Sequence, residues 1–369
     1  MLSPTSFWTQ PLPIDAPIDP ESATWVASVA GTIKNVNFLY RNTSIPLFWA
    51  TEKTPRQKVW LDVKSTSRPK LQAALESVPI PPNFRPPGPV SGDRVVCLVC
   101  PKVDGSIEYF EFHGMHQVEI DGPATEEEAP ECTWRSEPGW HCLAAAAVKD
   151  LRKNPGYVTE ADWPKGIDFG PKEAPPWYGG NMPLWGCSAS RTLSYHHTIK
   201  VAEAQRLYIP HALRFAIPRN LHRPEVRWPA VAADGESTNS AHPPTGSIFR
   251  FDPDDDFSDV ADDFVRAVCV AIRDHGLVLT DSSGLTGTGA ALKCETQATR
   301  YRSQEWGTDA WKGPEDEFGS AGAIFREGNE GNPSNETAPL GNQIPLGRLK
   351  ILDASYRPST VVAGHAKGA

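Results

Sequence analysis

Six consecutive residues, 108 to 113, combine side chains that could bind or cleave a sugar. Their sequence is Glu-Tyr-Phe-Glu-Phe-His, in a segment that has the composition of a β-strand. Successive side chains of a strand point to opposite faces, so Tyr109, Glu111 and His113 share one face. The opposite face carries Glu108, Phe110 and Phe112. A tyrosine, a carboxylate and an imidazole offer a stacking surface, an acid or base and a hydrogen-bond partner, as glycan clefts do. A solvated sheet face with structural histidines is an alternative that the pattern leaves open.

Other polar side chains that could complete such a cleft come from the centre of the chain. They are Arg191, Tyr195, His196, His197 and His211. We expect the candidate glycan-binding residues to be Tyr109, His113, Arg191, Tyr195 and His197. The catalytic set is unknown, with Glu108, Glu111 and His211 as candidates. A hydrolase would need two carboxyl groups within about 5 to 10 Å of each other.

Two patterns resemble metal sites, but no metal and no other cofactor is predicted. Cys97-x2-Cys100 followed by His113-x2-His116 has approximately the spacing of a zinc finger. Positions i and i+3 of a strand point to opposite faces, so the two cysteines are interpreted as core residues. Residues 252–256, Asp-Pro-Asp-Asp-Asp, lack the glycine and terminal glutamate of a calcium loop and precede a helix, which favours a capping role.

Two further motifs are too incomplete to predict chemistry. The glycines of residues 284–289 lack the lysine of a phosphate-binding loop, so no nucleotide site is expected. Residues 186–190, Gly-Cys-Ser-Ala-Ser, do not form a G-x-S-x-G nucleophile elbow. Cys187 and Ser188 are therefore expected to pack or to form hydrogen bonds.

Local patterns predict the elements that would position these residues. The clearest is a hairpin of strands 94–101 and 107–112, because Asp104-Gly105 favours a tight turn. Ser258 is a candidate N-cap for a helix that ends at Gly276 and is followed by a strand over 277–280. Further helices are predicted from Pro20 through Val29 and over 142–153, and further strands over 37–49 and 58–64.

The composition favours a β-rich fold. The chain has 369 residues, of which 36 are proline and 29 glycine, and such a content breaks helices repeatedly. The net charge of −9 argues against nucleic acid as a partner. The sequence contains no run of membrane-span length and no signal-peptide core, and the seven cysteines are an odd number. We therefore expect no membrane insertion and synthesis in a reducing cytoplasm.

Six short segments occur in an order that resembles a group of proteins from actinobacteria and their phages. The segments are residues 107–112, 186–190, 209–218, 228–235, 249–253 and 276–284. In addition, the opening sequence WTQPLPIDAPIDP, residues 8–20, is similar to the start of minor tail proteins from such phages. The chain departs from the group at Phe112, where the group has tryptophan, and at residues 189–192, where it has Ala-Ser-Arg-Thr instead of Ala-Ser-Gly-Leu.

The resemblance implies a jelly-roll-like β-sandwich with long Pro/Gly-rich loops and a few short helices. We expect a proline-rich arm over residues 1–22, a sandwich core over 23–285 and a loop-rich extension over 286–369. The resemblance also implies a virion location in the phage tail tip, with neighbouring tail-tip proteins and host cell-wall polysaccharide as partners. The expected role is structural and glycan-binding. The alternative is a polysaccharide lyase or glycoside hydrolase that acts on actinobacterial cell-wall glycan through Glu108 or Glu111 with His211.

Overall fold

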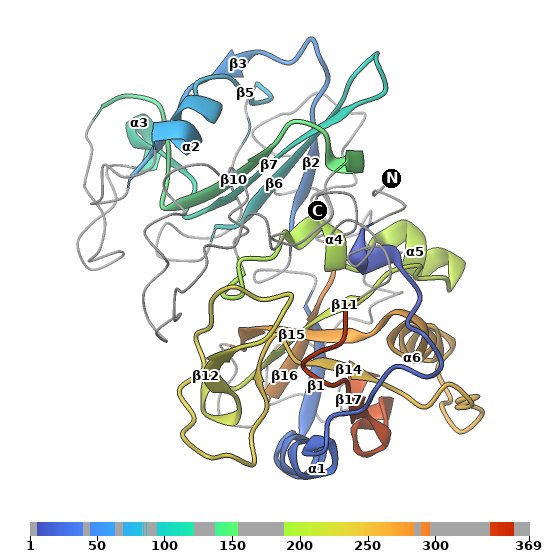
Figure 1. The fold of residues 1–369 in the computed structure, drawn as a ribbon. Helices are drawn as coiled ribbons and strands as arrows, with labels where there is room; N and C mark the ends of the chain where they lie inside the picture. The colour runs from blue at the N-terminus through green and yellow to red at the C-terminus, as the bar shows by residue number, and fades with distance from the viewer. Residues whose placement is uncertain are drawn as a thin grey trace, which may run out of the picture.

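A computed structural model describes residues 6–39, 45–62, 69–82, 84, 86, 94–121, 137–153, 188–283, 289–295 and 340–357. Within these residues the protein is mainly β, with several sheets and short helices, which confirms the expected class. A six-stranded sheet lies in the lower half of Figure 1 and a four-stranded sheet in the upper half. Residues 284–288 and Cys187, which belong to two of the motifs above, lie outside the described residues.

The six-stranded sheet combines segments from both ends of the chain. Its order is β1 (Asn35–Leu39), β16 (Gly289–Lys293), β11 (Leu213–Ile217), β15 (Leu277–Ser282), β14 (Ile248–Arg250) and β17 (Lys350–Ile351). The pairs β1–β16 and β11–β15 are parallel, whereas β11–β16, β14–β15 and β14–β17 are antiparallel. The sheet contains strands from both sides of residue 285, where the core domain was expected to end. β16 and β17 follow this residue, and β16 lies between β1 and β11.

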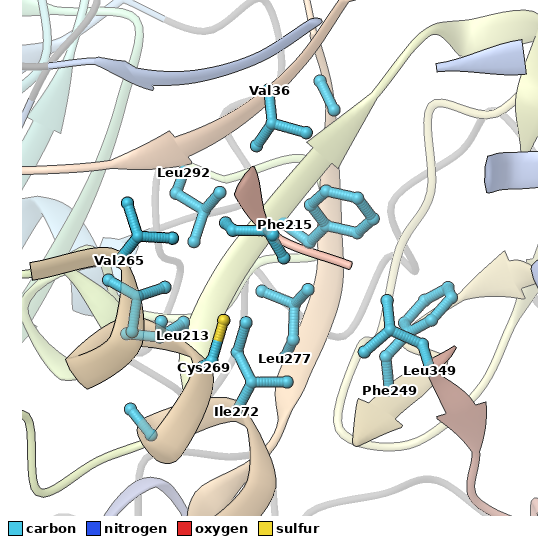
Figure 2. Packing of buried hydrophobic residues seen from close by; sticks show 14 of the residues in the cluster. Val36, Leu213, Phe215, Phe249, Val265, Cys269, Ile272, Leu277, Leu292 and Leu349 are labelled. Carbon is cyan, nitrogen blue, oxygen red and sulfur yellow. The ribbon is translucent and has the colours of Figure 1, made fainter. Parts of the chain in front are cut away.

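One face of this sheet packs against α6 (Asp263–His275) to form the largest hydrophobic cluster. Figure 2 shows the labelled side chains Leu213, Phe215 and Leu277 of the sheet beside Val265, Cys269 and Ile272 of α6. Each fully buried side chain of this size stabilises the fold by about 1.5 to 3 kcal/mol. Because successive side chains of a strand point to opposite faces, the alternate residues of these strands face the side of the sheet turned away from α6.

The ends of α6 agree only in part with the predicted caps. Gly276 ends the helix with φ +100, as expected. The N-cap is Asp262, whose carboxylate accepts from the amides of Phe264 and Val265 at 3.0 and 3.1 Å. Ser258 instead donates to Asp256 at 3.0 Å, so the predicted cap was placed four residues too early. The reason is that Phe257 and Val260 are buried by a turn ahead of the helix.

Residues 252–256 do not cap α6 either. The carboxylate of Asp252 pairs with Lys350, and it accepts from the Asp254 amide at 3.3 Å. These acids form local turns and an ion pair with the edge strand β17.

The four-stranded sheet contains the predicted hairpin. Its order is β10 (Ala144–Val148), β7 (Ile107–His113), β6 (Val96–Pro101) and β2 (Leu47–Trp49). Gly105 has φ +81 in the turn, and Asp104 accepts from the Ser106 amide at 2.8 Å. The expected strand over 37–49 is divided between β1 and β2, which belong to different sheets.

The predicted helix over 142–153 is wrong. This segment completes β9 (Trp140–Cys142), forms β10, and ends in the 3-10 helix η2 (Leu151–Lys153). The alanines favour a helix in isolation, but they pair in antiparallel register with β7, from Ala144 opposite His113 to Val148 opposite Tyr109. Sheet pairing and burial outweigh the local propensity here.

Both faces of the four-stranded sheet are covered. Phe110 and Phe112 pack in a cluster with Trp140, whereas Tyr109 packs in another cluster with Leu193 and Tyr195. The two-face alternation predicted for residues 108–113 is therefore correct, and the alternative of a solvated face is wrong.

The remaining elements are short. Three small sheets pair β3 (Arg56–Gln57) with β5 (Val78–Pro79), β12 (Arg223–Val226) with β13 (Pro244–Thr245), and β4 (Val59–Leu61) with β9 and β8 (His116–Gln117). The other α-helices are α1 (Ser22–Thr32), α2 (Pro69–Ala74), α3 (Val118–Asp121), α4 (Ser194–His197) and α5 (Val201–Arg206). The described residues also contain the 3-10 helices η1 (Phe7–Thr9), η5 (Arg219–Leu221), η8 (Leu340–Gln343) and η9 (Leu346–Arg348). Across the described ranges, none of the helices combines the length and apolar character that crossing a membrane requires.

The described part of the N-terminal arm packs on its own chain. Phe7 and Trp8 are buried, and the Ala212 amide donates to the Trp8 carbonyl at 2.6 Å. Farther along, the Leu12 amide donates to the Asp274 carbonyl at 2.7 Å. Residues 6–12, which belong to the expected proline-rich arm, are therefore part of the core.

Candidate functional site

A cavity of about 540 Å³ lies on the face of the six-stranded sheet that is turned away from α6. Leu39, Ala216 and Ala291, from β1, β11 and β16, form a small apolar cluster on this face and line the cavity. His113 and Ala144, from the four-stranded sheet, line it as well. The cavity thus lies where side chains of the two larger sheets meet.

The charged side chains around the cavity are mainly basic. Of the described residues that line it, four are basic and two are acidic: Arg191, Arg214, Arg219 and Lys293, with Asp234 and Asp281. The whole chain has a net charge of −9, so this local excess is opposite to the overall charge. Such a cavity attracts an anion more strongly than the rest of the molecule does.

Arg214 and Asp281 form an ion pair at the cavity wall. The Arg214 side chain is 4% exposed and that of Asp281 20%. β11 and β15 are parallel neighbours with a register shift after Phe215, and this irregularity aligns Ala216 with Asp281. The carboxylate of Asp281 balances the positive charge of the nearly buried Arg214 guanidinium. A buried charge without such a partner would strongly destabilise the fold.

The Ser282 amide brings the two carboxylates of the cavity close together. Asp234 accepts from this amide at 3.1 Å, and Asp281 accepts from it at 3.0 Å. His222 lies next to them, with Nε2 3.0 Å from the Ser282 hydroxyl and Nδ1 3.0 Å from that of Thr245. Burial lowers the pKa of His222 to about 4 although Asp234 acts in the opposite direction, so this imidazole is neutral at pH 7.

A network of buried hydroxyl groups holds the segment that carries Arg191. Ser188, Ser190 and Thr192 lie within 3.0 Å of one another through their side-chain oxygens. The Ser190 amide donates to the Thr280 carbonyl of β15 at 2.9 Å. Arg191 itself has φ +66, a left-handed conformation that a non-glycine residue rarely adopts. From this position Arg191 lines the cavity.

Glu111, a predicted catalytic residue, is fully buried and has a structural environment. Its carboxylate accepts from the Ser194 amide at 2.8 Å, from the Ser194 hydroxyl at 2.9 Å and from the Tyr109 hydroxyl at 2.5 Å. Burial, followed by the neighbouring Cys97 and Glu111, raises the pKa of Tyr109 well above its ordinary value, so the phenol stays protonated. This network links β7 to α4.

The other two catalytic candidates lie elsewhere. Glu108 is on the opposite face of β7 and pairs with Arg56 at 2.9 Å and Lys102 at 3.4 Å. His211 is buried, with Nε2 3.0 Å from Glu203 and Nδ1 2.8 Å from the Ala212 carbonyl. Neither these two nor Glu111 is among the described residues that line the cavity.

The candidate glycan-binding residues divide into two groups. His113 and Arg191 line the cavity. Tyr195 packs edge-on against Tyr109 at a ring distance of 5.8 Å, and His197 packs against Trp8 at 5.0 Å. Burial, followed by the charge of Arg214, lowers the pKa of His197 well below its ordinary value. Tyr109, Tyr195 and His197 therefore act as core residues.

Sequence reasoning missed most of the charged side chains of the cavity. Arg214, Asp281 and Lys293 each occur within or at the end of an apolar strand. A charged residue inside such a strand is uncommon, because burying an unpaired charge costs free energy. This is the signal that could have identified them.

The two cysteines of the sequence pattern that resembles a zinc finger lie on different faces of β6, as the strand alternation predicted. Cys97 packs in the cluster that contains Tyr109, whereas Cys100 lies opposite Glu108 in the strand register.

Comparisons of this chain with protein-family models, with curated proteins and with solved structures gave no match.

Proposed function

We propose that this protein is a binding component that holds an anionic group of a polysaccharide in the cavity between its two larger sheets. The observation that carries the proposal is the set of four basic residues against two acidic ones in the described lining of a cavity of about 540 Å³. Ligand-binding pockets typically have volumes of about 300 to 1,000 Å³, so a charged sugar unit fits this space.

The residue types suit a carboxylate, sulfate or phosphate substituent. A guanidinium presents its N–H groups as a planar fork that matches these anions, and such charge-assisted hydrogen bonds are strong. Arg219 is the exposed one among these four basic residues, with a side chain 55% exposed, whereas Arg191 and Lys293 are half-buried and Arg214 is buried. Asp234 and the Ser282 and Ser283 hydroxyl groups provide partners for sugar hydroxyl groups.

The resemblance to phage minor tail proteins supports a place for this binding component in a tail tip, in contact with host cell-wall glycan and with neighbouring tail proteins. It also supports a jelly-roll-like sandwich. The parallel pairs β1–β16 and β11–β15 depart from an antiparallel jelly roll, so we propose a sandwich-like packing of two sheets with a modified strand order.

A glycoside hydrolase is a second candidate, because Asp234 and Asp281 accept from the same amide. Two neighbouring carboxyl groups are the catalytic pair of most such enzymes. One of the two must be protonated to act as the acid, however, and the Arg214 guanidinium stabilises the charged form of Asp281. Binding without cleavage therefore fits the geometry better. A lyase or hydrolase that uses Glu108 or Glu111 with His211 has no support from their positions.

The test measures retention and cleavage in the same tube. Purified protein is incubated with cross-linked polyuronate or with cross-linked dextran, which is neutral, and both the retained protein and the released oligosaccharides are measured. We expect retention on the polyuronate that decreases with salt, and no release. Equal retention on the two resins would contradict anion binding, whereas release that disappears in Asp234→Asn would establish the hydrolase.

Variants locate the binding to the cavity. Arg219→Gln and Lys293→Gln each remove one charge-assisted contact, so we expect each to weaken binding by about 3- to 10-fold. Arg206→Gln is the matched control, because Arg206 is exposed and lies outside the cavity lining. Equal losses in all three variants would indicate a nonspecific charge effect and contradict the proposed site.

A further inference from the structure

The small sheet β4–β9–β8 brings two histidines and an aspartate together away from the cavity lining. His116 and His141 are directly opposite each other in the β8–β9 register. Asp62 follows β4, and its amide donates to the Cys142 carbonyl at 2.8 Å. One possible ligand atom from each of the three side chains lies within 4.8 Å of the others. All three residues are at most 1% exposed.

Hydrogen bonding fixes the tautomer of His116. Its Nδ1 lies 3.0 Å from the Gly114 carbonyl oxygen. A carbonyl only accepts, so Nδ1 carries the hydrogen and the neutral ring has its lone pair on Nε2. This Nε2 is buried, and no described residue forms a hydrogen bond with it. Burying such an acceptor without a donor costs free energy, so the atom needs an electrophilic partner.

His141 has the complementary arrangement. Its Nε2 lies 2.9 Å from the Glu137 carbonyl oxygen and therefore carries a hydrogen. Its Nδ1 lies 3.0 and 3.1 Å from the carboxylate oxygens of Asp62. In a neutral ring this Nδ1 also has a lone pair, which would face the negative carboxylate. Either a proton or a metal ion must lie between them.

A proton on His141 satisfies this pair but leaves His116 unsatisfied. The lone pair on His116 Nε2 would still have no partner among the described side chains and backbone groups. A cation in the centre satisfies both imidazoles and the carboxylate at the same time.

We propose that Asp62, His116 and His141 bind a divalent transition-metal ion, with Zn²⁺ as the best candidate. Two imidazoles and a carboxylate are a ligand set typical of zinc. Zinc-bound histidines usually donate their other N–H to a carbonyl or carboxylate, and here the Gly114 and Glu137 carbonyls take this position. Zn–N and Zn–O bonds of about 2.0 to 2.2 Å require the three side chains to move slightly closer together. In the sequence, His116 is close to His113 and the two cysteines but distant from His141, so no metal site was predicted.

The burial of the site indicates a structural role for the metal. β4 and β9 have three residues each and β8 has two, which is too little for a stable independent sheet. Asp62 and His141 are 79 residues apart in the chain. A metal ion that joins them with His116 cross-links long connecting segments and stabilises the fold through its binding free energy.

The test uses the full chain after removal of metal with a chelator and dialysis. Zn²⁺ is titrated by equilibrium dialysis, and Co²⁺ is added separately to record the visible absorption of a site with nitrogen ligands. We expect one equivalent of bound metal, a Co²⁺ spectrum that Zn²⁺ displaces, and a thermal midpoint that rises with Zn²⁺. His116→Gln and Asp62→Asn should weaken Zn²⁺ binding by about 100-fold or more.

His242→Gln is the matched control, because His242 is partly buried and lies outside the cluster. It should bind metal as the wild-type protein does. Circular dichroism of each metal-free variant verifies folding, and if His116→Gln does not fold, the wild-type Co²⁺ spectrum alone decides. A wild-type protein that binds neither Zn²⁺ nor Co²⁺, or folded variants that bind both normally, would overturn the proposal.

Discussion

At the scale of single residues, Glu111 and Glu108 show how two carboxylates of one strand take different roles. Glu111 is fully buried and accepts three hydrogen bonds, two of them from Ser194. Glu108 pairs with partly exposed cations. Glu111→Gln removes the charge that these donors stabilise, so we expect a loss of about 2 to 3 kcal/mol in the free energy of unfolding. Glu108→Gln should cost at most about 1 kcal/mol. Urea unfolding measures both, and equal losses would contradict the structural role of Glu111.

The buried histidines predict how stability depends on pH. Burial lowers the pKa of His196 to about 3 and that of His222 to about 4. An unfolded chain protonates histidine near pH 6.5. Between about pH 6.5 and 4 the unfolded state therefore binds more protons, and stability falls as the pH falls, by up to about 1.4 kcal/mol per pH unit for each group.

His222→Asn tests this assignment. The variant loses contacts at every pH. Between pH 6.5 and 4, however, its free energy of unfolding should fall less steeply than that of the wild-type protein, because unfolding takes up about one proton fewer. Urea unfolding at several pH values gives the slope. A slope identical to that of the wild-type protein would show that His222 is not buried in its neutral form.

At the scale of elements, two glycines differ in what an added side chain would meet. Gly276 ends α6 with φ +100, and a Cβ there would lie 3.0 Å from Ile248. Gly31 is exposed in α1, and a Cβ added there would meet no described residue within 4 Å. We expect Gly276→Ala to cost about 1 to 3 kcal/mol, because the conformation is strained for alanine. Gly31→Ala should stabilise the protein by about 0.5 to 1 kcal/mol through helix propensity. Thermal and urea unfolding compare the two, and shifts in the same direction would contradict this account of the helix ends.

At the scale of the whole molecule, residues 340–357 complete a core that begins near the N-terminus. The Val36 amide donates to the Asn342 side chain at 2.8 Å, and the Ile351 amide donates to the Ser22 hydroxyl at 2.7 Å. Ile344 and Leu349 belong to the largest hydrophobic cluster. We expect a chain that ends at residue 339 to lose cooperative thermal unfolding, compared with a chain that ends at residue 357. A folded shorter chain would show that the sheet forms without β17.

The sequence by itself determined the features that depend on neighbouring residues. The β6–β7 hairpin, α1, the end of α6 at Gly276 and the start of β15 were all predicted, because turn residues, caps and periodicity act within a few positions. The mainly β class also followed from the composition.

Only the tertiary structure decided which residues meet. Arg214 and Asp281 face one cavity because β11 and β15 pair across a long stretch of chain. Glu111 became a buried acceptor because α4 covers its strand, and His116 meets His141 rather than His113 because β8 pairs with β9. Burial and pairing between distant segments outweigh local patterns in free energy, which is why the predicted helix over 142–153 is sheet and most of the predicted glycan site is core.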